Sequence, residues 1–328
     1  MLSHCCKLYI KIIHRNPLND INGQSLISNR MSDKYTVYRN DIKNKKKNQI
    51  DPADVEWDGC TEKDFEQDTD QIDYRISECV REKYDMLDLS NMSDRCFSDL
   101  IEHVEYKSIQ MKLKHLFMSN SHLKNIPSLV DFVNLETLDL NNNLIDRLPV
   151  LPESLQELNI ENNRLKHINQ MFPNMKRLFC KNNLLENLVI ASSMERIECS
   201  HNPLRTLRSF DGKYGGIYYM DCSNTLITEI PPMERLRQLD CSNTPLTKLP
   251  RIDSLKVLSS NDSGLEDITL LNSLESIAMV RNNINSLHYF ASLQEITFEK
   301  SRNIMFSKKY RVKCLQENRN EIYKVIFE

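Results

Sequence analysis

A repeat of about 20 residues runs through the second half of the chain and limits its fold more than any other sequence feature. The consensus is Leu-x-x-Leu-x-Leu-x-x-Asn-x-Leu, and its clearest copy begins at Leu135. Ten copies align on their first apolar residue, at Leu113, Leu135, Leu155, Met175, Met194, Ile217, Leu236, Leu255, Leu274 and Leu293. Their starts are 19 to 23 residues apart, and the fourth position is apolar in all ten. We therefore expect one structural unit per copy, with the units stacked along one axis.

The pattern assigns an environment to each position of a copy. Side chains alternate along a strand, so positions 4 and 6 point to one face and positions 3, 5 and 7 to the other. One copy cannot bury its apolar row alone, whereas stacked copies form a continuous core. Position 9 is often Asn, whose amide can donate and accept hydrogen bonds where the chain leaves the strand. Thr225 and Thr244 replace it in two middle copies, so we expect a less regular ladder there.

Residues 84–306 resemble the leucine-rich repeat family through this consensus. The stretch from Leu148 to Leu155, Leu-Pro-Val-Leu-Pro-Glu-Ser-Leu, is similar to the linker of the short repeats in bacterial effector proteins. The resemblance implies an α/β solenoid, a leucine-rich repeat horseshoe with a parallel β-sheet on its concave face. Repeats this short leave little room for a helix, so we expect an extended or 3₁₀ convex side. Heavy use of Asn, Ile and Lys also suggests a resemblance to repeat proteins of giant DNA viruses.

The chain is expected to divide into four parts. Charge runs and few apolar residues near the N-terminus predict disorder. Before the first short repeat, apolar residues recur at helical spacing from Phe97 to Val104, which predicts a helical cap. The parts are a mostly disordered charged segment at 1–80, an N-terminal capping repeat with a short helix at 84–112, about ten short repeats at 113–306, and a C-terminal cap at 307–328.

Composition argues against several classes of function. The net charge of -3 and the pI near 6.3 lack the basic excess of a nucleic-acid-binding protein. No run approaches the 18 or more apolar residues of a membrane span, and the N-terminus is a poor signal peptide. We therefore expect an intracellular, cytoplasmic protein that is monomeric and binds neither membranes nor nucleic acid.

Four of the ten cysteines fall at position 6 of consecutive copies: Cys180, Cys199, Cys222 and Cys241. A zinc site would need all four sulfurs about 2.3 Å from one point. Stacked strands lie about 4.8 Å apart, so a straight ladder of four rungs cannot converge on one ion. Free cysteine packs as a small apolar residue. We therefore expect reduced core thiols, with no metal and no cofactor.

Catalytic signatures are missing from the sequence. There are only six glycines, and none forms a phosphate-binding or nucleophile motif. No paired cysteines or histidines have zinc-protease or zinc-finger spacing. We therefore expect no catalytic residues and no enzymatic activity.

Position 5 of the middle copies carries a row of carboxylates, Glu198, Asp221 and Asp240. Like charges on adjacent strands repel each other, so the row needs an explanation. Cations at Arg177 and Arg196, together with Lys181, would compensate it. Alternatively, the row would bind a partner. The sequence leaves both explanations open.

Aromatic residues strengthen the binding interpretation. Phe179 at position 5 and Tyr219 at position 3 are expected to expose their rings on the same face, and aromatic and Arg side chains often anchor interfaces. A glycine-containing insertion lengthens the copy at Met194 to 23 residues beside them. The predicted partner-binding residues are Arg177, Phe179, Arg196, Glu198, Tyr219, Asp221 and Asp240.

The family resemblance implies a non-catalytic scaffold that binds a protein on its concave face. The partner's identity cannot be read from the sequence. Bacterial effectors of this type can carry a ubiquitin-ligase domain after the repeats, but only a short segment follows Leu293. The alternative is therefore a substrate-recognition adaptor of a ubiquitin ligase or a similar complex.

Overall fold

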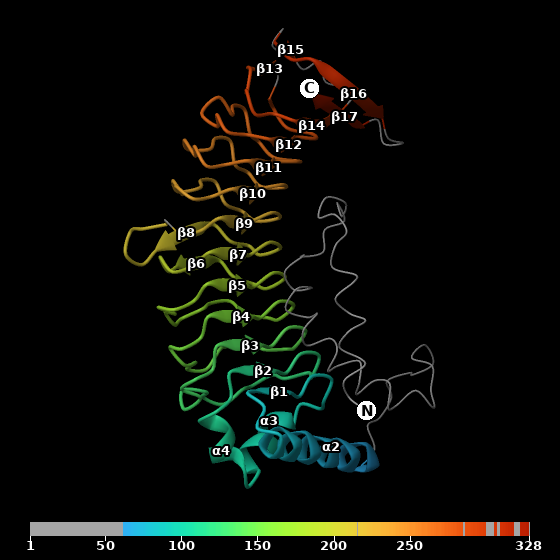
Figure 1. Cartoon of the computed structure of the whole chain (residues 1–328), viewed down its shortest axis with the longest axis vertical. Helices are drawn as coiled ribbons and strands as arrows, with labels where there is room; N and C mark the ends of the chain where they lie inside the picture. Colours follow the sequence, from blue (N-terminus) through green and yellow to red (C-terminus); the bar gives the residue numbers. More distant parts are fainter. Residues whose placement is uncertain are drawn as a thin grey trace, which may run out of the picture. The chain divides into compact units, whose positions relative to one another are not determined.

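A computed structural model describes residues 62–214, 216–284, 286–299, 305–306, 309–317 and 322–327. Each of the ten repeats contributes one short strand, and Figure 1 shows these strands stacked side by side. Within the described residues the sheet has 13 strands, in the order β1-β2-β3-β4-β5-β7-β9-β10-β11-β12-β14-β17-β16. The repeat strands are β2 (His115–Phe117), β3 (Thr137–Asp139), β4 (Glu157–Asn159), β5 (Arg177–Phe179), β7 (Arg196–Glu198), β9 (Tyr219–Asp221), β10 (Gln238–Asp240), β11 (Val257–Ser259), β12 (Ser276–Ala278) and β14 (Glu295–Glu299).

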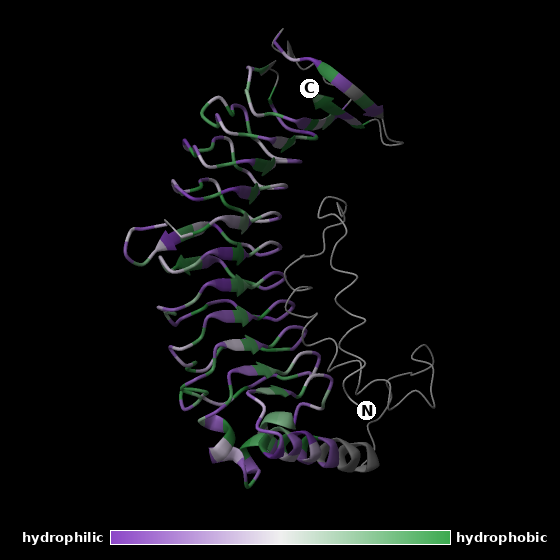
Figure 2. Cartoon of the chain, viewed as in Figure 1, coloured by the Kyte–Doolittle hydropathy of each residue, from purple (hydrophilic) through white to green (hydrophobic). Residues whose placement is uncertain are grey.

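The register of the sheet follows the repeat alignment. Every pair of neighbouring repeat strands is parallel and places position 4 beside position 4, as in Leu158 beside Leu178. All ten position 4 side chains are at most 2% exposed. The predicted register and core are therefore confirmed. In Figure 2 each turn of the solenoid has both apolar and polar segments, because one repeat contributes to the core and to the surface.

The back of the repeats is extended, without an α-helix or 3₁₀-helix among the described residues from 113 to 299. Two short parallel pairs lie there, β6 (Asn187–Ile190) with β8 (Thr206–Ser209), and β13 (Ser286–Leu287) with β15 (Met305–Phe306). A tight turn often precedes position 1, as where Leu155 N–H donates to the Pro152 carbonyl at 3.3 Å. The predicted solenoid with an extended convex side is confirmed.

In the repeats beginning at Leu135, Leu155, Met175 and Met194, the Asn at position 9 connects the repeat to the preceding one. Asn163 Nδ2 donates to the position 6 carbonyls of its own repeat, Ile160 at 3.1 Å, and of the preceding repeat, Leu140 at 2.9 Å. Its Oδ1 accepts from Ile145 N–H at 3.0 Å. The same set is made by Asn143, Asn183 and Asn202. Thr225 and Thr244 make one bond each, at 2.7 Å, to their own repeat. The less regular ladder predicted there is confirmed.

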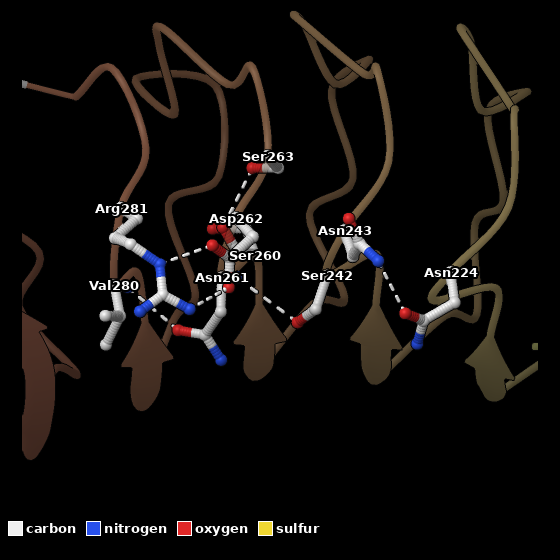
Figure 3. A network of polar contacts seen from close by, with 9 residues as sticks. All are labelled: Asn224, Ser242, Asn243, Ser260, Asn261, Asp262, Ser263, Val280 and Arg281. Atoms are coloured by element: carbon white, nitrogen blue, oxygen red, sulfur yellow. Dashed lines mark hydrogen bonds and ion pairs between the residues drawn. The ribbon is translucent and has the colours of Figure 1, made fainter.

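Position 8 adopts a left-handed backbone, which the sequence analysis did not predict. Nine repeats have φ between 53° and 56° there, at Asn120, Asn142, Asn162, Asn182, His201, Asn224, Asn243, Asp262 and Arg281. Asn tolerates this conformation better than most residues, which explains the Asn-rich turns. Neighbouring position 8 side chains also bond each other, as Asn243 Nδ2 does to Asn224 Oδ1 at 2.6 Å (Figure 3).

The N-terminal end begins with a helix that the sequence analysis missed. We predicted residues 1–80 to be mostly disordered, but α2 occupies Glu62–Arg81. Its buried residues Ile72, Ile76 and Cys79 recur every three or four residues and form one apolar face, while most of the charged residues of the helix are acidic. The remaining part of the predicted disordered segment, 1–61, lies outside the described residues. No helix in the described part of the chain is both long and apolar enough to cross a membrane.

The two ends of the repeat stack are covered by different elements. The segment predicted as an N-terminal capping repeat contains β1 (Met86–Asp88), which pairs with β2, and the short helices α3 (Cys96–Glu102) and α4 (Tyr106–Gln110). At the other end β17 (Ile322–Phe327) pairs antiparallel with β14, and β16 (Val312–Glu317) pairs antiparallel with β17. The terminal rungs are thereby covered, as a repeat stack requires.

Candidate partner-binding face

The predicted site residues come together on four neighbouring strands, β5, β7, β9 and β10. Position 3 places Arg177, Arg196 and Tyr219 side by side. Position 5 aligns Phe179, Glu198, Asp221 and Asp240 in the same way. We call positions 3, 5 and 7 of the repeats beginning at Leu155, Met175, Met194, Ile217 and Leu236 the middle face.

The two arginines are held by different carboxylates. Arg196 pairs within its own strand with Glu198, at 2.9 Å from Nε and 2.5 Å from Nη2. Its guanidinium also lies 3.6 Å from the centre of the Tyr219 ring, in a cation–π contact. Arg177 pairs instead with Glu157 on β4, at 2.5 Å. Of the two arginines expected to compensate the carboxylate row, only Arg196 therefore does so.

The middle face is less exposed than predicted. Phe179, Arg196 and Glu198 are each 5% exposed. The expectation that Phe179 exposes its ring is therefore wrong. The other predicted residues, Arg177, Tyr219, Asp221 and Asp240, are half-buried and keep part of their side chains at the surface.

Asp221 and Asp240 also have a structural role that the sequence analysis missed. Asp221 Oδ1 accepts from the backbone N–H of Ser223 at 3.0 Å, and Asp240 Oδ1 accepts from that of Ser242 at 2.9 Å. Asn159 Oδ1 accepts the N–H of Glu161 in the same way, at 3.1 Å. An Asp or Asn at position 5 therefore satisfies the donor two residues later, where the strand ends.

Two central repeats lack this arrangement. Position 5 is Phe179 in one and Glu198 in the next, and neither can form the short side-chain turn. In other repeats that lack it, the position 7 side chain of the preceding repeat substitutes, as where Asn261 N–H donates to Ser242 Oγ at 3.2 Å (Figure 3). Among the described residues, no side chain substitutes in the repeats of Phe179 and Glu198. At these two positions the side chain is buried instead, and Glu198 pairs with Arg196.

Glu161, at position 7, is a further member of the acidic row. Burial, with the nearby carboxylates of Glu198, Asp139 and Asp221, raises its pKa to about 7, although Lys181 opposes the shift. Burial also raises the pKa of Glu198, against the effect of Arg196. For Asp240 burial and then Asp221 raise the pKa. Glu161, Glu198 and Asp240 are therefore each close enough to another carboxylate to be affected by its charge.

The cysteine ladder is part of the core. Cys180, Cys199, Cys222 and Cys241 are all buried and free, and burial raises the pKa of each thiol far above its usual range. The Cys199, Cys222 and Cys241 thiols each donate, at 3.4 Å, to the position 5 carbonyl of the following repeat. Ser260 continues this row with the same bond. In the described part of the chain, no group of three or more His, Cys, Asp or Glu side chains could hold a metal ion.

Comparison with known proteins agrees with the repeat architecture. The family described as leucine-rich repeats (2 copies) matches residues 112–153. Human oligodendrocyte-myelin glycoprotein is 31% identical over 134 residues, which are 38% of this chain and only 30% of that relative's length. The likeness to a giant-virus protein and the cytoplasmic location remain predictions.

Two solved structures have a similar fold. YopM, a leucine-rich effector protein from Yersinia pestis, matches with a TM-score of 0.55 and 20% identity over 80% of this chain and 81% of that one. The leucine-rich repeat domain of APL1B matches with a TM-score of 0.50 and 16% identity, over 82% of this chain and 99% of that one. The ten aligned repeats and their parallel strands resemble those of leucine-rich repeat proteins, and the family model matches part of this region.

Proposed function

We propose that the chain is a non-catalytic scaffold and that its middle face binds a basic segment of a partner protein. Leucine-rich repeat proteins generally mediate interactions between proteins, which supports the class of function. The location rests on one observation. The middle face carries five carboxylates, Glu157, Glu161, Glu198, Asp221 and Asp240, and three cations, Arg177, Lys181 and Arg196.

The ion pairs leave the excess of negative charge on one part of the middle face. Arg177 is held by Glu157 and Arg196 by Glu198. Glu161, Asp221 and Asp240 then outnumber Lys181, the remaining cation of the middle face. Lys or Arg side chains of a partner would relieve this repulsion, and such charge complementarity speeds association and selects partners.

Tyr219 is the best candidate for an anchor in this face. Its ring is half-buried, and Arg196 stacks on it at 3.6 Å. Tyrosines that are ordered by their neighbours lose little conformational freedom when a partner covers them. Tyr219→Ala is expected to weaken partner binding by more than about 1 kcal/mol.

The structure offers a substitution that removes charge without removing the turn. Asn159 already makes the position 5 turn with its Oδ1, so Asp221→Asn with Asp240→Asn should keep both backbone hydrogen bonds. Affinity capture from the native cell, with parent and double variant compared quantitatively, would identify a partner. Its association rate with the purified double variant should fall, and added salt should reduce the difference.

A control variant and a truncated protein complete this experiment. Asp146→Asn changes an exposed acidic residue outside the middle face and should leave the association rate unchanged. If the double variant binds as fast as the parent, while protein lacking residues 1–61 loses the partner, the N-terminal segment is the binding element and the proposal is wrong.

A further inference from the structure

A second concave feature lies on the back of the repeats, where the solenoid is interrupted by the insertion after β8. It is a cavity of about 220 Å³. Its walls come from three consecutive repeats and reach the core residue Leu178. Most of the lining is apolar, and Met171, Val189 and Phe210 are 46%, 45% and 67% exposed. Large apolar side chains clustered around an open cavity often mark a binding site.

The loop beside the cavity is tightly organised. Asp211 Oδ1 accepts from Ser209 Oγ at 2.8 Å and from Lys213 N–H at 3.1 Å. The Tyr214 hydroxyl accepts from Ser209 N–H at 3.0 Å. A Cβ at Gly216 would lie 2.5 Å from the Met194 carbonyl oxygen, so the end of the insertion packs against the backbone of the repeat. Phe210 is therefore exposed on a loop held by specific contacts.

One charge is present at this cavity. Asp211 is the single ionisable residue in the lining, and it is exposed. Hydrogen bonds from Ser209 and Lys213 lower its pKa, so the carboxylate stays negative at neutral pH. The cavity therefore combines apolar walls with a fixed negative charge at its opening.

We propose that this cavity binds a partner segment in which one large apolar side chain lies next to Lys or Arg. The volume suits a side chain of the size of Leu, Met or Phe, which would pack against Met171, Val189 and Phe210. The neighbouring cation would pair with Asp211. The site is separate from the middle face, so a partner could use either surface alone.

Methionine methyl groups provide a direct measurement. Met171 and Met194 line the cavity, while Met279 is buried at position 6 of a distant repeat. The full chain labelled with ¹³C at the methionine methyls would be titrated with the peptide acetyl-Gly-Arg-Leu-Arg-Gly-amide. The Met171 and Met194 signals should shift and saturate in the millimolar range, and Met279 should not move. The same peptide with Ala in place of Leu should bind about tenfold or more weakly.

Variants test the charge and the exposed ring. Asp211→Asn keeps Oδ1 for the loop but removes the charge, so peptide affinity should fall by about two- to fivefold. Asp253→Asn, at another exposed acid, should not change it. Phe210→Ala removes an exposed wall and should weaken the peptide more than Asp211→Asn does. An unchanged Met279 signal in each variant shows that the repeats remain folded.

Three outcomes would overturn the proposal. The first is no saturable shift of Met171 or Met194 with the peptide. The second is equal binding of the Leu and Ala peptides, or of a peptide with Glu in place of both Arg residues. The third is saturation by the neutral probe benzyl alcohol but not by the peptide, which would assign the cavity to apolar small molecules.

Discussion

The buried turn after each strand is built differently in two stretches of the solenoid. From Asn143 to Asn202, position 9 is always Asn, and each amide bonds its own repeat and the preceding one. In the next three repeats position 9 is Thr225, Thr244 and Ser263. Each hydroxyl bonds only the position 6 carbonyl of its own repeat, at 2.7, 2.7 and 2.8 Å. The first stretch therefore has buried position 9 bonds between repeats that the second lacks.

The second stretch gains contacts between repeats closer to the surface. Asn261 Oδ1 accepts from Val280 N–H at 2.8 Å, and its own N–H donates to Ser242 Oγ (Figure 3). Arg281 forms an exposed two-point ion pair with Asp262. Exposed bonds compete with water and contribute less than buried ones. We therefore expect the second stretch to unfold locally more easily than the first.

The largest expected effect is the loss of stability when a position 4 Leu is replaced by Ala, and it should be equal in the two stretches. Leu158 and Leu239 occupy position 4, with exposures of 0% and 2%. Replacing either by Ala removes buried methyl groups and should lower the free energy of unfolding by about 2 to 5 kcal/mol. Urea melts of the two variants measure this directly. If either variant melts like the parent, the assigned core register is wrong.

The next effect depends on pH. Because the folded pKa of Glu161 is raised from 4.5 to about 7, the folded chain holds this proton more tightly than the unfolded chain. The stability from protonation is complete below pH 4.5 and is lost as the pH rises to 7. At pH 8, Glu161→Gln should therefore stabilise the protein by up to about 3 kcal/mol.

Melts at pH 4 and pH 8 separate this explanation from a change in packing. The benefit of Glu161→Gln should disappear at pH 4, where the parent carboxyl is protonated. Glu186→Gln, at an exposed position of the following repeat, should have little effect at either pH. A benefit of equal size at both pH values would contradict the assigned pKa.

A third effect, the loss of stability on changing position 9, should differ between the two stretches. Asn163→Thr should keep at most the bond to Ile160 and lose those to Leu140 and Ile145. Buried groups left without partners cost about 1 to 3 kcal/mol, so a loss in that range is expected. Thr225→Ala removes one bond and should cost about 1 kcal/mol. Equal losses for the two substitutions would show that the bonds between repeats add nothing.

Features that arise from the repeat itself or from nearby residues in the chain could be predicted from the sequence. The position 4 core and the Asn ladder repeat with the chain's own period, so ten copies reveal them together. Helix α2 was missed because acidic residues dominate its composition, although Ile72, Ile76 and Cys79 carry a readable helical spacing. The Asp turns at position 5 were also readable, since an Asp or Asn two residues before a strand-end donor is a known turn signal.

The pairing on the middle face could not be predicted in this way. Arg177 and Arg196 occupy the same repeat position, yet one bonds across to Glu157 and the other bonds along its own strand to Glu198. That choice depends on side-chain conformation and on neighbouring residues, which the repeat pattern does not contain. Burial of Phe179 and the raised pKa of Glu161 depend on the same packing.

The smallest effect is the reverse exchange, Thr225→Asn. An Asn at this position would place Nδ2 near the position 6 carbonyls of Cys199 and Cys222, and Oδ1 near Leu204 N–H, by analogy with Asn202 one repeat earlier. Cysteine already lies at position 6 of the repeats that Asn202 joins, so the amide fits beside a thiol. Stability should rise by up to about 1 kcal/mol. Amide hydrogen exchange should slow at Leu204 and its neighbours but not near Leu140, whose repeat already has an Asn at position 9. If Thr225→Asn destabilises the protein while exchange at Leu204 speeds up, the second stretch cannot accommodate the amide, and the difference between the two ladders is one of space rather than of bonding.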